Sequence, residues 1–314
     1  MSSTCCCVLL PIRPDRIAVI IPPELHARLR DLRLSARSAA GASGLGMHAS
    51  RSRGAGLEFA QYRGYEPGDE PRRIDWKLYA RSDRFFVRES ERDSSLSAWL
   101  VVDASASMAQ ADSARKDFDK LAAAKLLAAC VIELALRQGD RFGLIVLSAG
   151  APVFVAAASG ARQRDRCLLE LDRLVSAGVL PSARQLLPLW ERVRAGEVVL
   201  LLSDFFDDAL ADMAVRLAAA QRDVVSIQLL SAQERDFPFK GGHLFRDPET
   251  GSERRADAPA IRAQFLEDFV AARAALRRRF VAAGMRHVEC FLDQPFDAPL
   301  RRLFGARADA LERT

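Results

Sequence analysis

Three oxygen-bearing side chains follow one apolar run in the chain. The stretch LVVDASASM, residues 100–108, ends its apolar part with Asp103 and then places serines at two alternate positions, Ser105 and Ser107. A second apolar run, VVLLLSD, ends in Asp204. Carboxylate and hydroxyl oxygens are the ligands that hard divalent cations such as Mg²⁺ prefer. We therefore take Asp103, Ser105, Ser107 and Asp204 as candidate metal ligands.

The same residue types also begin helices. Ser and Asp at a strand end often accept hydrogen bonds from the first backbone N–H groups of the next helix. Asp204, with Asp207 and Asp208 behind it, precedes a predicted helix, so capping competes with metal binding there. Open α/β sheets bind ligands outside the carboxyl ends of their strands, and two carboxylates that meet there repel each other unless a cation lies between them. The residue pattern alone leaves both interpretations open.

Short apolar runs alternate with helical patterns from residue 97 onward. Continuous hydrophobicity is typical of parallel strands buried on both faces, and the alternation indicates an α/β fold. The sequence predicts strands over 97–103, 142–148, 152–157, 197–204, 223–230 and 286–292. It predicts helices over 23–37, 115–138, 163–176, 207–221 and 258–283, a strand in RFFVRES, and a hairpin-like insertion near 237–255.

The composition is that of an ordinary globular protein. The chain has 314 residues, of which 49% are hydrophobic and 28% are charged. No apolar run reaches the ~18 residues that a membrane-spanning helix needs, and the first residues lack a signal-peptide pattern. The six cysteines form no CxxC pair, and Cys130, Cys167 and Cys290 lie in apolar patterns typical of core residues. We expect a cytoplasmic protein without a transmembrane segment.

Other chemistries have weaker support. The net charge of +5 comes from residues 1–53, which hold eight Arg and three acidic residues. Such an arm can touch nucleic acid or acidic lipid, but a solvated arm is the simpler interpretation, and we expect no nucleic-acid partner. The sequence has no phosphate-binding loop, HExxH or GxSxG motif, and its four His are scattered, so no nucleophile has an evident base.

Two stretches resemble a known family. DASAS resembles the DxSxS signature of the metal-ion-dependent adhesion site in von Willebrand factor A domains. Residues 50–91, SRSRGAGLEFAQYRGYEPGDEPRRIDWKLYARSDRFFVRESE, resemble the signature region of the bacterial domain-of-unknown-function family 58. The later stretches LLSDFFDD and FPFKGGHLFRDPETG are similar to that family as well, so the resemblance covers roughly residues 40–305.

The resemblance implies a Rossmann-like von Willebrand A-type fold. This is an open, mainly parallel sheet with helices on both faces, preceded by a small β-containing subdomain. The expected organisation is an N-terminal arm with a short helix (1–40), the family signature region (41–95), the von Willebrand A-like domain (96–305) and a tail (306–314).

The resemblance also implies a metal site. Mg²⁺, or Mn²⁺, would be held by Asp103, Ser105 and Ser107, with Asp204 as the later acidic position, often reached through water. Adhesion sites usually add a Thr between these two acidic positions, and this chain has none there. Ser182 is the best substitute, ahead of Ser159 and Ser176.

Such families often accompany MoxR-type AAA+ ATPases, with the A domain as an adaptor or co-chaperone. The resemblance therefore implies a non-enzymatic module whose partner is such an ATPase or its client. A metal-dependent hydrolase, with Asp207 or Asp208 as base, and a structural domain with a degenerate site remain as alternatives. In the signature region, a partner surface competes with an internal packing network. The residues concerned are Asp69, Arg72, Arg73, Asp75, Trp76 and Arg81.

Overall fold

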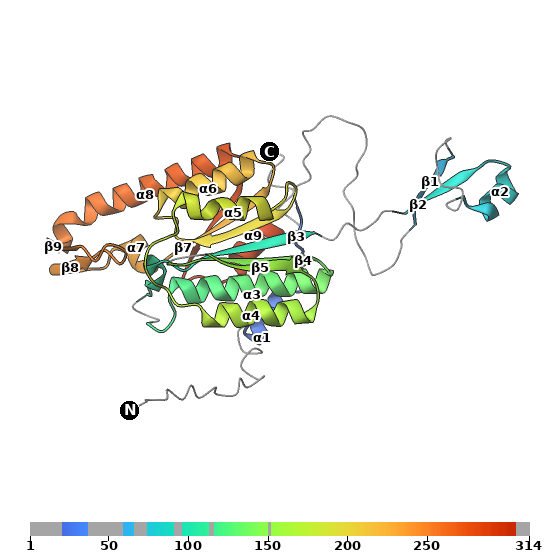
Figure 1. Ribbon diagram of the computed structural model, residues 1–314. Helices are drawn as coiled ribbons and strands as arrows, with labels where there is room; N and C mark the ends of the chain where they lie inside the picture. Colours follow the sequence, from blue (N-terminus) through green and yellow to red (C-terminus); the bar gives the residue numbers. More distant parts are fainter. Residues whose placement is uncertain are drawn as a thin grey trace, which may run out of the picture. The chain divides into compact units, whose positions relative to one another are not determined.

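The chain divides into two compact units. The structure is a computed structural model that describes residues 21–36, 59–65, 74–90, 96–112, 116–149 and 152–305 (Figure 1). One unit combines residues 1–39 with 96–314, and the other spans residues 40–95. The smaller unit is thus inserted into the sequence of the larger one.

The larger unit is built on a six-stranded sheet with the order β10-β7-β6-β3-β4-β5. In chain order its strands are β3 (Ser97–Asp103), β4 (Arg141–Leu147), β5 (Val153–Ala158), β6 (Val198–Ser203), β7 (Asp223–Leu230) and β10 (Arg286–Phe291). Neighbours run parallel, except that β5 is antiparallel to β4 at one edge. The first strand, β3, therefore lies inside the sheet, with β4 on one side and β6 on the other.

Both faces of this sheet are buried under helices. On β3, Leu100 and Val102 face one hydrophobic core, while Trp99 and Val101 face the other. The first core is completed by α3 (Lys120–Gln138), α4 (Ala161–Arg173) and α9 (Asp297–Phe304). The second is completed by α5 (Ala183–Arg192), α6 (Asp208–Ala219) and the C-terminal part of α8 (Ala258–Ala282). Figure 1 shows α5, α6 and α8 on one side of the sheet and α3 and α4 on the other.

This architecture confirms the predicted fold class. All six predicted strands are present within one residue at either end. The four inner strands, β3, β4, β6 and β7, are buried along almost their whole length, as expected for mainly apolar runs covered on both faces. The predicted insertion is a hairpin of β8 (Gly242–Arg246) and β9 (Glu253–Asp257). The sequence did not predict η3 (Ala106–Ala109), α5, α7 (Ala232–Asp236) or α9.

The arm before the smaller unit packs on the larger one. The predicted helix over 23–37 is shorter than expected: α1 (Pro23–Arg28) ends at Leu29, whose carbonyl accepts a hydrogen bond from the guanidinium of Arg137 on α3. Leu34 exchanges two hydrogen bonds with the side-chain amide of Gln138, and these hold the chain extended. Leu25, Leu29, Leu32 and Leu34 are all buried in the first core.

The smaller unit contains an antiparallel pair of strands. These are β1 (Phe59–Gly64) and β2 (Phe86–Ser90), and α2 (Trp76–Ser82) lies between them in the sequence. The rings of Tyr79 and Phe85 stack with centroids 4.5 Å apart, and Trp76 meets both edge to face. The expectation of a small β-containing part is therefore confirmed.

Two further observations concern the cysteines and the apolar length of the helices. The thiols of Cys130, Cys167 and Cys290 are free and buried, as their apolar surroundings in the sequence predicted. Among the described residues, no helix is both long enough and apolar enough to cross a membrane.

Candidate functional site

The site lies at the switch point of the sheet, where the strands that come after β3 in the chain are placed on opposite sides of it. After β3 the chain continues to β4 on one side of it, and later returns to β6 on the other side. In open α/β sheets, the crevice outside the carboxyl ends of the strands at this switch point is the usual place for a ligand. Asp103 ends β3 and Asp204 follows β6, so the fold brings both predicted carboxylates to this crevice.

Asp103 is buried and held by two hydrogen bonds. Its Oδ1 accepts from the backbone N–H of Ser105 at 2.8 Å, and its Oδ2 accepts from the hydroxyl of Ser203 at 2.6 Å. Ser203 also accepts from the backbone N–H of Phe205 at 2.9 Å. These contacts fix the carboxylate at the end of β3, with only 1% of the residue exposed.

The environment of Asp103 disfavours its charged form. Burial raises the pKa of this carboxyl from 3.8 to about 6, even though the hydrogen bond from Ser203 lowers it, and the charge of Asp204 adds to the rise. Desolvation and a like charge both favour the neutral acid. A cation bound at this carboxylate would remove that disadvantage.

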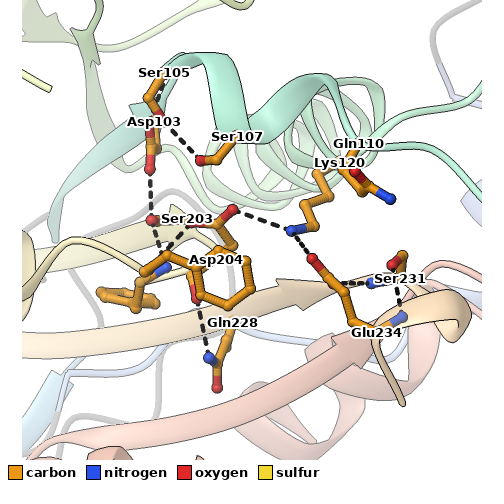
Figure 2. A network of polar contacts seen from close by, with 12 residues as sticks. Asp103, Ser105, Ser107, Gln110, Lys120, Ser203, Asp204, Gln228, Ser231 and Glu234 are labelled. Carbon is orange, nitrogen blue, oxygen red and sulfur yellow. Dashed lines mark hydrogen bonds and ion pairs between the residues drawn. The ribbon is translucent and has the colours of Figure 1, made fainter. Parts of the chain in front are cut away.

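Ser105 and Ser107 place two hydroxyls beside Asp103. Ser105 is the residue before η3, but its side chain makes no capping hydrogen bond. Instead its Oγ lies 3.1 Å from the Oγ of Ser107, and both residues are buried (Figure 2). The capping interpretation therefore does not account for the hydroxyl of Ser105, and the two oxygens form a small polar pair beside the carboxylate.

A lysine that the sequence analysis did not single out reaches the same crevice. Lys120, the first residue of α3, is completely buried, and its Nζ donates to Asp204 Oδ2 at 3.1 Å and to Glu234 Oε1 at 2.6 Å. The ammonium also lies 4.4 Å from the centroid of the Phe206 ring. Figure 2 shows this lysine between the two carboxylates. It joins the start of α3, the end of β6 and the short helix α7.

Glu234 is fixed by the local structure of α7. Its carboxylate accepts from the backbone N–H of Ser231, and the hydroxyl of Ser231 accepts from the backbone N–H of Glu234. This reciprocal capping box follows directly from the sequence spacing of Ser and Glu. The box is the one signal that could have located Glu234, because nothing in the sequence predicts its pairing with Lys120.

The other acidic residues behind β6 have separate roles. Asp207 caps α6 by accepting from the backbone N–H of Ala209 at 2.7 Å, so the capping interpretation is right for this residue. The side chain of Asp208 is 99% exposed. Asp204 does not cap that helix: its Oδ1 accepts from the backbone N–H of Phe206, and its Oδ2 pairs with Lys120.

The predicted substitute for the missing Thr lies in other contacts. Ser182 is exposed, and both its hydroxyl and its backbone N–H donate to the side chain of Gln185 at the start of α5. The loop before it bonds to the DASAS segment through Ala177 and Gly178, which carry no hydroxyl. The contacts of Ser182 thus involve α5 rather than the candidate metal ligands.

The donor set fits a hard cation. Within the described residues, no three His, Cys, Asp or Glu side chains are grouped so that they could hold a metal ion together. The candidate set instead consists of the carboxylate of Asp103 and the hydroxyl oxygens of Ser105 and Ser107. Such all-oxygen sets suit Mg²⁺ or Mn²⁺.

The predicted partner surface is only partly described. Asp75 caps α2 by accepting from the backbone N–H groups of Lys77 and Leu78, which is a structural role. Trp76 is 58% exposed and Arg81 is exposed, as a partner surface would need. Asp69, Arg72 and Arg73 lie outside the described residues.

The sheet and its strand-end motif define a von Willebrand A-like domain. The chain belongs to the family described as proteins of unknown function DUF58, whose model matches residues 61–279. It is 30% identical to the uncharacterised proteins Mb1516 of Mycobacterium bovis and Rv1480 of Mycobacterium tuberculosis, over 91% of this chain and 90% of theirs.

Solved structures with a similar fold have diverged far in sequence. The conserved hypothetical protein BatB from Bacteroides thetaiotaomicron is 11% identical, with a TM-score of 0.41 over 70% of this chain and all of that one. The VWA domain of SpRpn10 is 11% identical, with a TM-score of 0.39 over 67% of this chain and 97% of that one. The fold assignment therefore depends on the sheet order and on the family match.

Proposed function

We propose that the protein is a non-enzymatic interaction module that binds Mg²⁺, or Mn²⁺, at Asp103, Ser105 and Ser107. The cation would bind an acidic side chain of a partner protein. The supporting observation is the charge of the crevice: Asp204 and Glu234 share the ammonium of Lys120, whereas the buried carboxylate of Asp103, beside two hydroxyls, accepts hydrogen bonds only from Ser105 and Ser203 among its described contacts. A divalent cation balances the remaining charge.

The chemistry of Mg²⁺ suits this role. It usually keeps several waters when protein side chains bind it, so a carboxylate from another molecule can replace one of them. The donor set contains one carboxylate, that of Asp103, and its described contacts include no cationic side chain. Asp204 is neutralised in part by Lys120 and contributes charge beside the cation. A site with few charged ligands stays attractive to an incoming anion.

The partner follows from the family resemblance. We propose a MoxR-type AAA+ ATPase or its client, with this protein acting as an adaptor or co-chaperone in the cytoplasm. Exposed apolar side chains near the crevice suit a protein partner: Phe206 and Val179 are each 53% exposed. Phe206 lies two residues after Asp204, and Val179 follows Gly178, whose carbonyl accepts from the backbone N–H of Ala106 in the DASAS segment.

A metal-dependent hydrolase is the second candidate and has less support. Such an enzyme needs a base that can activate water on the cation. The sequence offered Asp207 or Asp208 for this, but Asp207 accepts a capping hydrogen bond and Asp208 is almost fully exposed. These contacts favour binding over hydrolysis.

The metal site is tested by calorimetry with Mg²⁺ and Mn²⁺, using Ca²⁺ for comparison. We expect binding to the wild type that is lost in Asp103→Asn, because the amide keeps the shape of the side chain and removes its charge. Asp207→Asn is the matched control, since it changes a nearby carboxylate that caps α6, and we expect it to retain binding. Absence of Mg²⁺ and Mn²⁺ binding in the wild type would overturn the proposal and favour a degenerate site.

The partner role and the hydrolase alternative need separate measurements. Binding of the full chain to a MoxR-type AAA+ ATPase is expected in Mg²⁺ and is expected to disappear in chelator and in Asp103→Asn. Turnover of nucleic acid or phosphoester substrates that requires Mg²⁺ or Mn²⁺ and Asp103 would show an enzyme instead.

A further inference from the structure

One positive charge is already built into the crevice. The side chain of Lys120 has no exposed surface, and its Nζ lies 3.1 Å from Asp204 Oδ2 and 2.6 Å from Glu234 Oε1. Figure 2 shows the ammonium between these two carboxylates, and the ring of Phe206 lies over it at 4.4 Å from the centroid. A lysine is buried this completely only when such partners pair with its charge.

The backbone at the start of α3 fixes the position of this lysine. Lys120 is the first residue of the helix, and its backbone N–H donates to the carbonyl of Gln110 at 3.0 Å. The backbone N–H of Gln110 donates in turn to the carbonyl of Ser107 at 3.2 Å. The preceding residue, Asp119, caps the helix by accepting from the backbone N–H of Ala122. The lysine and a candidate metal ligand are therefore joined by short backbone hydrogen bonds.

Asp204 connects the lysine to the other candidate ligands. The residue before it, Ser203, donates from its hydroxyl to Asp103 Oδ2 at 2.6 Å, so the backbone of Asp204 begins beside that carboxylate. The carboxylate of Asp204 pairs with Lys120 through Oδ2, and its Oδ1 accepts from the backbone N–H of Phe206. Both oxygens of Asp204 are engaged, and its negative charge is shared with an ammonium.

An ion bound at the end of β3 would have to compete for this charge. The ion and the ammonium of Lys120 are both attracted by Asp204, and they repel each other. Buried charges interact more strongly than exposed ones, because water and salt screen them less. The ammonium belongs to the chain and is always present, whereas a divalent ion is taken up from solution. Lys120 therefore reduces the free energy that a bound ion gains here.

We propose that Lys120 is a resident cation that competes with Mg²⁺ for the charge of Asp204 and so lowers the affinity of the metal site. This inference rests on the metal site proposed above and identifies the residue that controls how readily it fills. Glu234 acts in the opposite direction, because its carboxylate shares the ammonium and draws part of that positive charge away from Asp204.

The first test measures Mg²⁺ affinity of the full chain by calorimetry. We expect Lys120→Met, which keeps a long unbranched side chain and removes the charge, to bind Mg²⁺ about tenfold more tightly than the wild type. Lys125→Met is the matched control on α3, because Lys125 donates only to backbone carbonyls among its described hydrogen bonds. Its affinity should stay within about twofold of the wild type.

A second variant keeps the lysine in place. Glu234→Gln retains a side-chain oxygen that can accept from the backbone N–H of Ser231, so the capping box of α7 is preserved. The loss of charge leaves Lys120 to Asp204 alone, and we expect Mg²⁺ to bind about threefold more weakly than in the wild type. Glu133→Gln is its control, because Glu133 lies in the C-terminal half of α3 and pairs with His26 on the arm.

A double variant covers the case in which Lys120→Met does not fold, as judged by circular dichroism. Lys120→Met combined with Glu234→Gln removes one charge of each sign and leaves only one of the two carboxylates without its cation. We expect it to bind Mg²⁺ about tenfold more tightly than Glu234→Gln alone, because the competing ammonium is gone. Equal or weaker binding by the double variant would count against the competition.

The opposite signs distinguish this role from a structural one. If Lys120 only held the crevice together, breaking the bridge from either side would loosen the site, and weaker Mg²⁺ binding by both single variants would overturn the inference. Binding that depends on Asp103 but is equal in the wild type and all variants of the bridge would also overturn it and leave the metal site standing. No Mg²⁺ binding to the wild type or to any variant would overturn both.

Discussion

Lys120 determines the charge balance of the crevice at the scale of single residues. A fully buried lysine is rare unless it is paired, and this one pairs with two carboxylates from different elements. Its single positive charge balances one of these two carboxylates, so the pair keeps a net negative charge beside the buried carboxylate of Asp103.

Replacing Lys120 should therefore be costly. We expect Lys120→Met to lower the free energy of unfolding by about 3–5 kcal/mol at pH 7 in chelator, because it leaves two carboxylates buried without their cation. Urea denaturation measures this change. Lys125→Met is the control on the same helix, since Lys125 donates only to the backbone carbonyls of Asp172 and Leu174 among its described hydrogen bonds.

A double substitution identifies the cause of the loss. Lys120→Met combined with Glu234→Gln should recover part of the stability, because one unpaired charge is removed. Equal unfolding free energies for Lys120→Met and Lys125→Met would show that the pairing of Lys120 contributes little.

At the scale of the elements, a buried titratable side chain, that of His287, lies where β10 pairs with β7. His287 on β10 shares a hydrogen bond of 2.9 Å with the hydroxyl of Ser226 on β7. Its Nε2 is buried and has no hydrogen-bond partner within the part of the chain that the structure describes. Burial is the main cause that lowers the pKa of this imidazole from 6.5 to about 4; the charge of Glu289 opposes the shift, and the guanidinium groups of Arg277 and Arg273 add to it.

This edge of the sheet should make stability depend on pH. Between about pH 6.5 and pH 4 the unfolded chain binds a proton at His287 that the folded protein does not, so stability falls as the pH falls through this window. The loss amounts to about 3 kcal/mol. We expect His287→Asn to remove this component, so urea denaturation from pH 7.5 to pH 4.5 should show a smaller decrease than in the wild type. Parallel pH profiles would contradict this assignment.

The sequence predicted the sheet well because each strand carries its own signal. A continuous apolar run identifies a strand buried on both faces without knowledge of its neighbours. The helix α5 was missed because Pro188 interrupts its pattern, and α7 was missed because five residues are too few to show a period.

The candidate site was predictable only in part, for a related reason. Asp103, Ser105 and Ser107 form one short motif, and Asp204 ends a recognisable strand. The pairing of Lys120 with Glu234 joins residues 114 positions apart, which no local pattern specifies.

At the scale of the whole molecule, the arm belongs to the core of the larger unit although the smaller unit separates them in the sequence. Leu29 is 2% exposed and packs in the same core as β3 and α3. The guanidinium of Arg137 donates to the carbonyl of Leu29, and Arg28 pairs with Asp297 on α9. Residues on both sides of the insertion thus stabilise one sheet.

A substitution in the arm should therefore destabilise the larger unit. We expect Leu29→Ala to lower its free energy of unfolding by about 2–5 kcal/mol, as for other buried leucines. Leu187→Ala is the control, because Leu187 is 58% exposed, and its effect should stay within about 0.5 kcal/mol. Urea denaturation followed by circular dichroism measures both. An unchanged value for Leu29→Ala would show that the arm does not contribute to the core.

The contact between Arg28 and Asp297 also has a consequence for synthesis on the ribosome. These two residues lie 269 positions apart, and ribosomes add about 5–20 residues each second, so the arm waits roughly 10–50 s for its last partner. During that interval its leucines have no completed core to enter, while the segment of the smaller unit has already been made. The nascent chain therefore exposes the leucines of the arm well before α9, one of the helices that complete their core, has been made.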